Sequence, residues 1–134
     1  MTSPPSPLVR SLIVCEDIIA DPNNRKRVSL MNVVDSIRSM KQPPYPVRQR
    51  QLCAFIQLTG CRGPGEFRVE IREADTDEVT FATKTFRGSF PNNPLAVHGL
   101  RFRLRWCKFP RPGLYWLAFF FDNQVLGQQP LTLS

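Results

Sequence analysis

The feature that most restricts the fold of this chain is a two-residue alternation of apolar and charged side chains. Residues 67–72 read FRVEIR, and residues 101–106 read RFRLRW. Successive side chains of a β-strand point to opposite faces, so both stretches predict strands with one buried face. No segment keeps a 3.6-residue apolar period for three turns, and we therefore expect almost no helix.

Six further apolar runs are bounded by turn-forming residues, at spacings of about 8–14 residues, as in β-sandwiches and barrels. We predict an all-β, antiparallel β-sandwich of about eight strands with little or no helix. At 134 residues, one such domain over residues 8–134 is expected after a flexible Pro/Ser tail at residues 1–7. The predicted strands are 9–19, 28–37, 52–58, 67–72, 79–86, 100–107, 114–121 and 130–133, with a loop at 88–94.

Residues 114–121, LYWLAFFF, are apolar without interruption, although a strand with one wet face should alternate. We expect Tyr115, Leu117, Phe119 and Phe121 to point into the sandwich. The outward residues would then include Leu114, Trp116 and Phe120, which together make a candidate protein interface. Three explanations stay open at this stage: the chain itself covers this face, a partner or second copy covers it, or it lines a small-ligand cleft.

Signatures of catalysis and of cofactor binding are missing from the sequence. The single histidine, His98, has no nucleophile motif beside it, and the glycines of residues 60–65 lack the Lys-Ser/Thr of a phosphate-binding loop. The acidic residues of 73–78 could ligate calcium, but a solvated hairpin turn explains them as well. We predict that the protein is not an enzyme and has no cofactor and no metal.

The four cysteines, residues 15, 53, 61 and 107, form no CxxC motif, which argues against a structural zinc site. Three of them fall in apolar strand patterns, so we expect free, buried thiols, although a bridge between Cys53 and Cys61 remains an alternative. The N-terminal segment lacks the apolar core of a signal peptide, and we expect no membrane span. These observations favour a cytoplasmic protein.

A formal net charge of +7 raises the expectation of an anionic partner. The charge is scattered, and the only run, Arg25-Lys26-Arg27, lies in the turn between the first two predicted strands. Arg101, Arg103 and Arg105 would form a row about 13 Å long on one face of a strand. This row is a candidate surface for anions or single-stranded nucleic acid, or an outward face that pairs with carboxylates across the sheet.

Several segments together resemble an uncharacterised bacterial β-sandwich family, a domain of unknown function. They are the hairpin LIVCEDII…RVSLMNVVDSI, the strand LCAFIQL, the strand GEFRVEI and the terminal PGLYWLAFFFDNQVLGQQPLTL. The family pattern has a Gly after the aspartate of the last hairpin, where this chain has Asn123, which suggests a longer turn. The resemblance implies the fold and no activity.

The sequence therefore supports two functional hypotheses. The first is a non-catalytic protein-interaction or assembly module, with self-association through the outer face of residues 114–121 as one form of it. The alternative is an anion- or single-stranded nucleic-acid-binding domain that uses the arginine row. The expected partner is a protein or a second copy, with nucleic acid as the second choice and no membrane.

Overall fold

The computed structural model describes residues 7–134, which form ten strands and no helix. The strands are β1 (Leu8–Asp21), β2 (Asn24–Val33), β3 (Ser36–Ile37), β4 (Val47–Thr59), β5 (Gly63–Glu73), β6 (Val79–Ala82), β7 (Phe86–Phe90), β8 (His98–Phe109), β9 (Gly113–Phe121) and β10 (Gln124–Leu133). The predicted tail of residues 1–7 lies, except for Pro7, outside the described residues. No helix of residues 7–134 is long and apolar enough to span a membrane.

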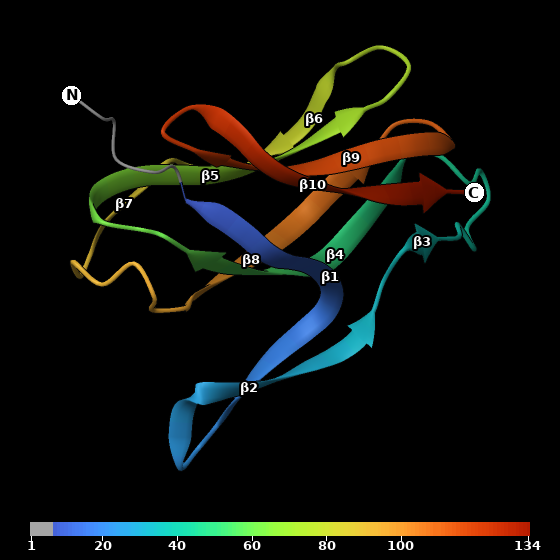
Figure 1. Cartoon of the computed structure of the whole chain (residues 1–134). Coiled ribbons are helices and arrows are strands. Elements are labelled where there is room, and N and C mark those ends of the chain that lie inside the picture. Colours follow the sequence, from blue (N-terminus) through green and yellow to red (C-terminus); the bar gives the residue numbers. More distant parts are fainter. Residues whose placement is uncertain (1–6) are drawn as a thin grey trace.

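The strands form two sheets that pack as a sandwich (Figure 1). The four-stranded sheet has the order β2-β1-β4-β8, and the six-stranded sheet has the order β3-β10-β9-β5-β6, with β7 also paired to β5. All pairings are antiparallel except that of β3 with β10. The predicted fold class is confirmed.

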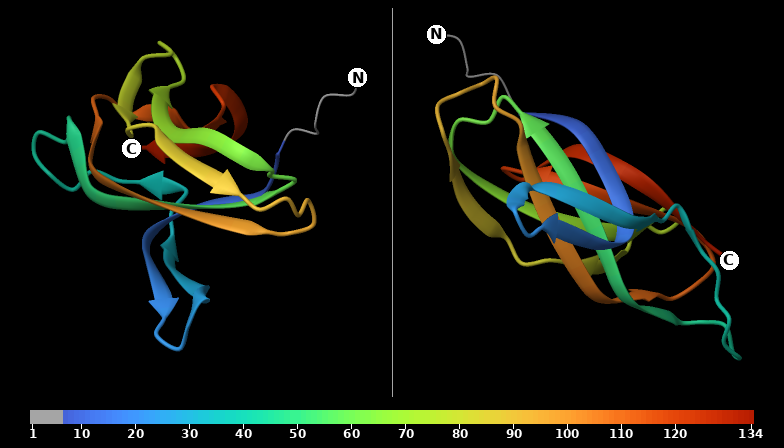
Figure 2. Two further views of the ribbon diagram at one scale, coloured as in Figure 1. Left: turned by 90° about the vertical axis from the view of Figure 1, so that its left-hand side faces the viewer. Right: turned by 90° about the horizontal axis from the view of Figure 1, so that it is seen from below.

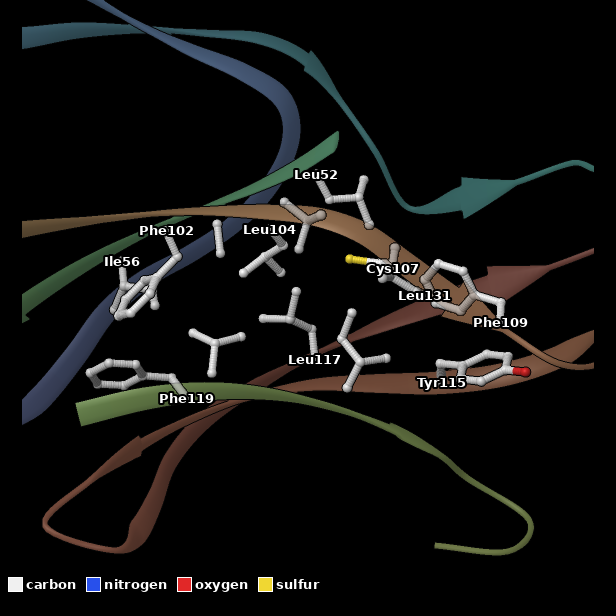
Figure 3. Close-up of a cluster of buried hydrophobic side chains, with 14 of the residues drawn as sticks. Leu52, Ile56, Phe102, Leu104, Cys107, Phe109, Tyr115, Leu117, Phe119 and Leu131 are labelled. Carbon is white, nitrogen blue, oxygen red and sulfur yellow. The ribbon is translucent and has the colours of Figure 1, made fainter. Parts of the chain in front are cut away.

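The core between the sheets is made of apolar side chains that both sheets contribute (Figure 3). Leu52, Ile56 and Leu104 come from the four-stranded sheet, and Leu117 and Phe119 come from β9; all five are fully buried. Tyr115 and Phe121 also point inward, so the inner face of the unbroken apolar run is the one predicted. The four cysteines are free and buried.

The first two strands form the predicted hairpin, whose tip projects from the body of the sandwich (Figure 2). The first half of β1 pairs with β4, and its second half pairs with β2. Asp21 pairs with Asn24, so the tight turn lies at Pro22-Asn23. The basic residues 25–27 lie near the tip of the hairpin as expected, but they belong to strand β2 and not to the turn.

The prediction of one strand at 79–86 followed by a loop at 88–94 is wrong. The structure has two strands, β6 and β7, that pair with successive parts of β5. Thr83 lies between them, where its hydroxyl accepts a hydrogen bond from the Val69 N–H and its own N–H donates to the Val69 carbonyl. Gly88 lies within β7 and pairs with Gly65, and a glycine suits this position because an added Cβ would lie only 3.3 Å from the Phe67 ring.

Strand β8 departs from the predicted alternation at Trp106. This residue was expected on the inner face with Phe102 and Leu104, but it is 63% exposed. Its φ of 59° lies in the left-handed region, which is rare for a bulky residue and turns the following residues over. Cys107 is buried instead of Trp106. In an uninterrupted strand Cys107 would point to the face opposite to Leu104, because the two residues are three positions apart.

The last hairpin turn is shorter than the Asn123 substitution suggested. Phe121 pairs directly with Gln124, which leaves a two-residue turn. Asp122 and Asn123 both have positive φ, 47° and 67°, as the mirror-image turns of tight hairpins require. Asparagine and aspartate tolerate this conformation better than most residues, so no glycine is needed here.

Candidate functional site

The three arginines of the predicted basic row lie on the outer face of β8, at the edge of the four-stranded sheet, and all are exposed. Two of them contact the hairpin. Arg101 Nη2 donates a hydrogen bond to the Arg25 carbonyl at 2.7 Å, and Arg103 Nη2 lies 3.1 Å from Asp17 Oδ1. Arg105 forms no ion pair with any described residue. The row is thus divided, because two members help to hold the hairpin on the sheet.

A second, smaller apolar cluster fixes the same hairpin to the outer face of the four-stranded sheet. The cluster contains residues of the hairpin and of β4 whose side chains point away from the main core. Its members are Cys15, Ile18, Cys53, Val28, Leu30 and Phe55. Figure 2 shows that the hairpin projects from the side of this sheet that faces away from the other sheet. The hairpin therefore makes one wall of a cleft on this face.

The cleft has a volume of about 770 Å³. The tip of the hairpin supplies Arg25 and Lys26, while Phe55 of β4 and Arg101 of β8 lie on the sheet between the walls. The opposite wall is the segment that joins β7 to β8, residues 91–97, together with the ends of both strands. The volume falls within the range of small-molecule sites.

Every charged side chain that lines this cleft is basic. Arg25, Lys26 and Arg101 line it, and no Asp or Glu of the described residues does. A cleft with walls of low dielectric and charges of one sign concentrates the electrostatic potential and attracts counter-ions. The arrangement is therefore suited to an anion, and we call it the basic cleft.

The single histidine also lines the basic cleft, at the first residue of β8. The His98 ring packs edge-on against Phe90, with ring centroids 5.0 Å apart. Its Nε2 atom is buried and has no hydrogen-bond partner among the described residues. His98 lies between apolar neighbours without a carboxylate to orient it, which is not the arrangement of a catalytic base.

The outer face of β9, which carries the candidate protein interface, is only partly open. Leu114 is 40% exposed and Trp116 is half-buried, but Phe120 is only 7% exposed. Phe120 points outward as expected, and its small exposed fraction fits the explanation, left open by the sequence, in which the chain itself covers this residue. A small cleft of about 240 Å³ remains beside Trp116 and Val125.

The chain itself covers Phe120. The guanidinium carbon of Arg68 lies 4.0 Å from the centre of the Phe120 ring, and that of Arg72 lies 5.8 Å from it. Glu70 lies between the two arginines and is hydrogen-bonded to both, at 3.1 and 2.9 Å. The hydrogen bond to Glu70 is the main reason that the pKa of Arg72 is raised. These cation–π contacts shield the outward-pointing Phe120 from water, so an apolar residue can stand at a position of this strand where alternation would place a polar one.

Three of the acidic residues considered for calcium, Glu73, Asp77 and Glu78, form ion pairs instead. Glu73 is buried and accepts hydrogen bonds from Arg111, and Asp77 lies 3.4 Å from Arg72. The Tyr115 hydroxyl donates to the Arg111 carbonyl at 2.7 Å, which locks this end of the sandwich. Residues 7–134 hold no group of three or more side chains able to bind a metal ion.

The basic cleft could not be recognised from the sequence because its parts are far apart in the chain. Both the basic triplet and the arginine row are visible in the sequence. No local sequence pattern shows, however, that the hairpin brings Arg25 close to Arg101. Residues 52–58 are predicted to form a strand, and nothing in that pattern assigns a role to Phe55. The only available signal was the alternation of residues 52–58, which places Phe55 on the face opposite to Leu52 and Ile56.

Fold and site define a two-sheet β-sandwich with a ligand-sized basic cleft on its four-stranded sheet. Residues 10–134 match a family of unknown function, DUF6941, and the chain belongs to this family. The predicted membership of a domain-of-unknown-function family is confirmed. No curated protein matches the chain.

Among solved structures, the chain is similar to the alkylpurine DNA glycosylase AlkC of Pseudomonas fluorescens, determined bound to DNA containing an abasic-site analogue. The TM-score is 0.51 at 13% identity, over 96% of this chain and 30% of the AlkC chain. An immunoglobulin-like protein of Pseudomonas aeruginosa matches with a TM-score of 0.40 at 8% identity, over 99% of this chain and 100% of its own. At such identities the likeness to AlkC concerns the fold alone.

Proposed function

We propose that the protein is a non-catalytic binding domain whose basic cleft holds an anionic ligand, with single-stranded nucleic acid as the first candidate. The observation that carries this proposal is the gathering of Arg25, Lys26 and Arg101 around about 770 Å³ of space with no described carboxylate in its lining. The net charge of +7 supports it, because basic proteins attract polyanions at long range.

The cleft is a better candidate than the arginine row taken alone. Arg103 is already paired with Asp17, so it offers less positive charge to a phosphate than an unpaired arginine does. Arg101 uses one donor on the Arg25 carbonyl, and a guanidinium has five. We therefore expect the phosphate contacts to come from Arg101 and from the hairpin tip.

Changing Arg25, Lys26 and Arg101 together to Gln should weaken binding of a mixed-sequence, single-stranded 12-mer at low salt. Three lost phosphate contacts should also flatten the plot of log K against log salt by about two units. Fluorescence anisotropy over a salt series measures both quantities. Arg101→Lys should retain most of the affinity, because it keeps the charge.

The matched control removes three exposed positive charges that do not line the cleft, by changing Lys41, Arg62 and Lys108 to Gln. If both triple variants lose the same affinity, the binding depends on net charge and the basic cleft has no special role. Failure of the unmodified protein to bind the 12-mer at low salt would remove the proposed function altogether.

A second candidate function is protein contact or self-association through the candidate interface of Leu114, Trp116 and Phe120. The observation in its favour is the 40% exposure of Leu114 beside the half-buried Trp116, next to a small cleft. With Phe120 under Arg68, the contact would rest on Leu114 and Trp116. This leaves less apolar area than the sequence suggested, which is why the basic cleft comes first.

Trp116→Glu should leave a folded protein, since Trp116 is already partly in water, and should abolish any self-association through this face. An unpaired carboxylate can remain hydrated in a monomer but not inside an apolar contact. Light scattering and thermal melting measure the two effects. Trp106→Glu is the matched control, because Trp106 is 63% exposed on the other sheet. An unchanged mass for Trp116→Glu would rule out self-association through this face.

A further inference from the structure

We propose that the basic cleft recognises a nucleobase together with its phosphate, with the base stacked on Phe55 and the phosphate held by Arg25, Lys26 and Arg101. This inference rests on the proposed function, since it names the chemical class of the anion. The shared chemistry is a phosphorylated aromatic ring, which a free nucleotide or the end of a nucleic-acid strand can supply.

Phe55 has the position that a stacking platform needs. It lies on the outer face of the sheet, lines the cleft, and is the direct cross-strand partner of Arg101. Its ring lies against Gly99 of β8, where an added Cβ would come within 3.2 Å of the ring. The glycine thus lets the ring lie close to the strand. Aromatic rings in such positions stack bases without regard to sequence.

The other aromatic rings of the cleft are already occupied. Phe90 contacts Phe67 and Phe121 at centroid distances of 6.3 and 6.0 Å, and His98 packs on Phe90 at 5.0 Å. Phe55 forms no ring–ring or cation–π pair with any described residue. Phe55 is therefore the ring of this lining that can accept a base.

The positive charges stand on the correct side of this ring for the phosphate. The Arg101 guanidinium extends from β8 to the hairpin tip, because its Nη2 reaches the Arg25 carbonyl at 2.7 Å. Lys26 is the next residue along the hairpin and also lines the cleft. A base on Phe55 would thus have cationic groups at one edge, where its sugar and phosphate extend. The cleft would thus bind the base and the phosphate of one nucleotide together, as proteins that bind single-stranded nucleic acid do.

Phe55→Leu should weaken binding of the single-stranded 12-mer by roughly 5- to 150-fold, the usual effect of losing one stacked base. Leucine keeps apolar contact with the small cluster around Cys53, so the fold should survive, and circular dichroism checks this. Phe55→Tyr should keep the affinity. A 12-mer of abasic deoxyribose phosphates has the same charge and no bases, and Phe55→Leu should not change its binding.

The outcomes separate this inference from the proposed function. If the abasic and the normal 12-mer bind equally well, and Phe55→Leu affects neither, the cleft binds phosphate alone and the inference is overturned while the proposed function stands. If neither oligomer binds, the proposed function itself fails. A nucleoside monophosphate in the same assay identifies the natural source of the ligand. If the mononucleotide saturates the Phe55-dependent binding, the ligand is a free nucleotide. If it does not, while the oligonucleotide binds tightly, the ligand is a nucleic-acid strand.

Discussion

Replacing Phe119 by alanine should lower the free energy of unfolding by about 3–5 kcal/mol, because the loss of a large core side chain leaves a cavity. Phe119 is fully buried between the sheets and its ring lies 6.1 Å from that of Phe102. Atoms of both sheets surround the Phe119 side chain, so neighbouring residues cannot easily relax into the cavity that the substitution leaves. Urea denaturation followed by fluorescence measures the change, with an unaltered slope as the sign that the transition remains two-state.

The neighbouring Phe120 provides the matched comparison, since it is the same residue type on the opposite face of the same strand. Phe120→Ala should cost less, about 1–3 kcal/mol, for the lost apolar area and the lost cation–π contact with Arg68. The side chains of Arg68 and Arg72 can move into the space, and water can reach it. If Phe120→Ala costs as much as Phe119→Ala, the outer face of β9 is as tightly packed as the core, and the cover of arginines is more rigid than their partial exposure suggests.

The inner face of β9 was predictable because strand periodicity is a local property. Once one of Tyr115, Leu117 and Phe119 faces the core, the two-residue period brings the other two with it. The same rule failed at Trp106, where a positive φ interrupts the period. Sequence alone gives no sign of that backbone rotation, because tryptophan has no preference for the left-handed region.

The cover over Phe120 shows a second limit of sequence reasoning. Residues 67–72 were read as a strand with a solvated charged face, and the alternation itself was correct. What the pattern could not show is that Arg68, Glu70 and Arg72 lie beside Phe120 on the adjacent strand and bind one another. The basic cleft could not be predicted for the same reason, since Arg25 and Arg101 are far apart in the sequence and come together only in the folded chain.

Stability should fall steeply above pH 9, because several buried groups hold their protons more tightly in the folded state. Burial raises the pKa of Cys107 from 9.0 to about 12, and burial also raises the pKa of Cys15, Cys53 and Cys61. The pKa of Tyr115 is raised in the same way. The stabilisation is complete below the unfolded pKa and is lost as the pH rises through the folded pKa. For Cys107 the loss therefore lies between pH 9 and about pH 12.

Cys107→Ala isolates the largest of these contributions. Within that pH window the Cys107 thiol reduces the free energy of unfolding by about 1.4 kcal/mol per pH unit. The variant should therefore be less stable than the parent at pH 7, as a core truncation, and should recover about 2–3 kcal/mol relative to it by pH 11. Urea denaturation at pH 7, 9, 10 and 11, with reductant present, measures this difference, and the other titrating groups cancel because both proteins contain them. Parallel curves for the two proteins would mean that the Cys107 thiolate is tolerated in the folded state, so that water reaches the core at this end of β8.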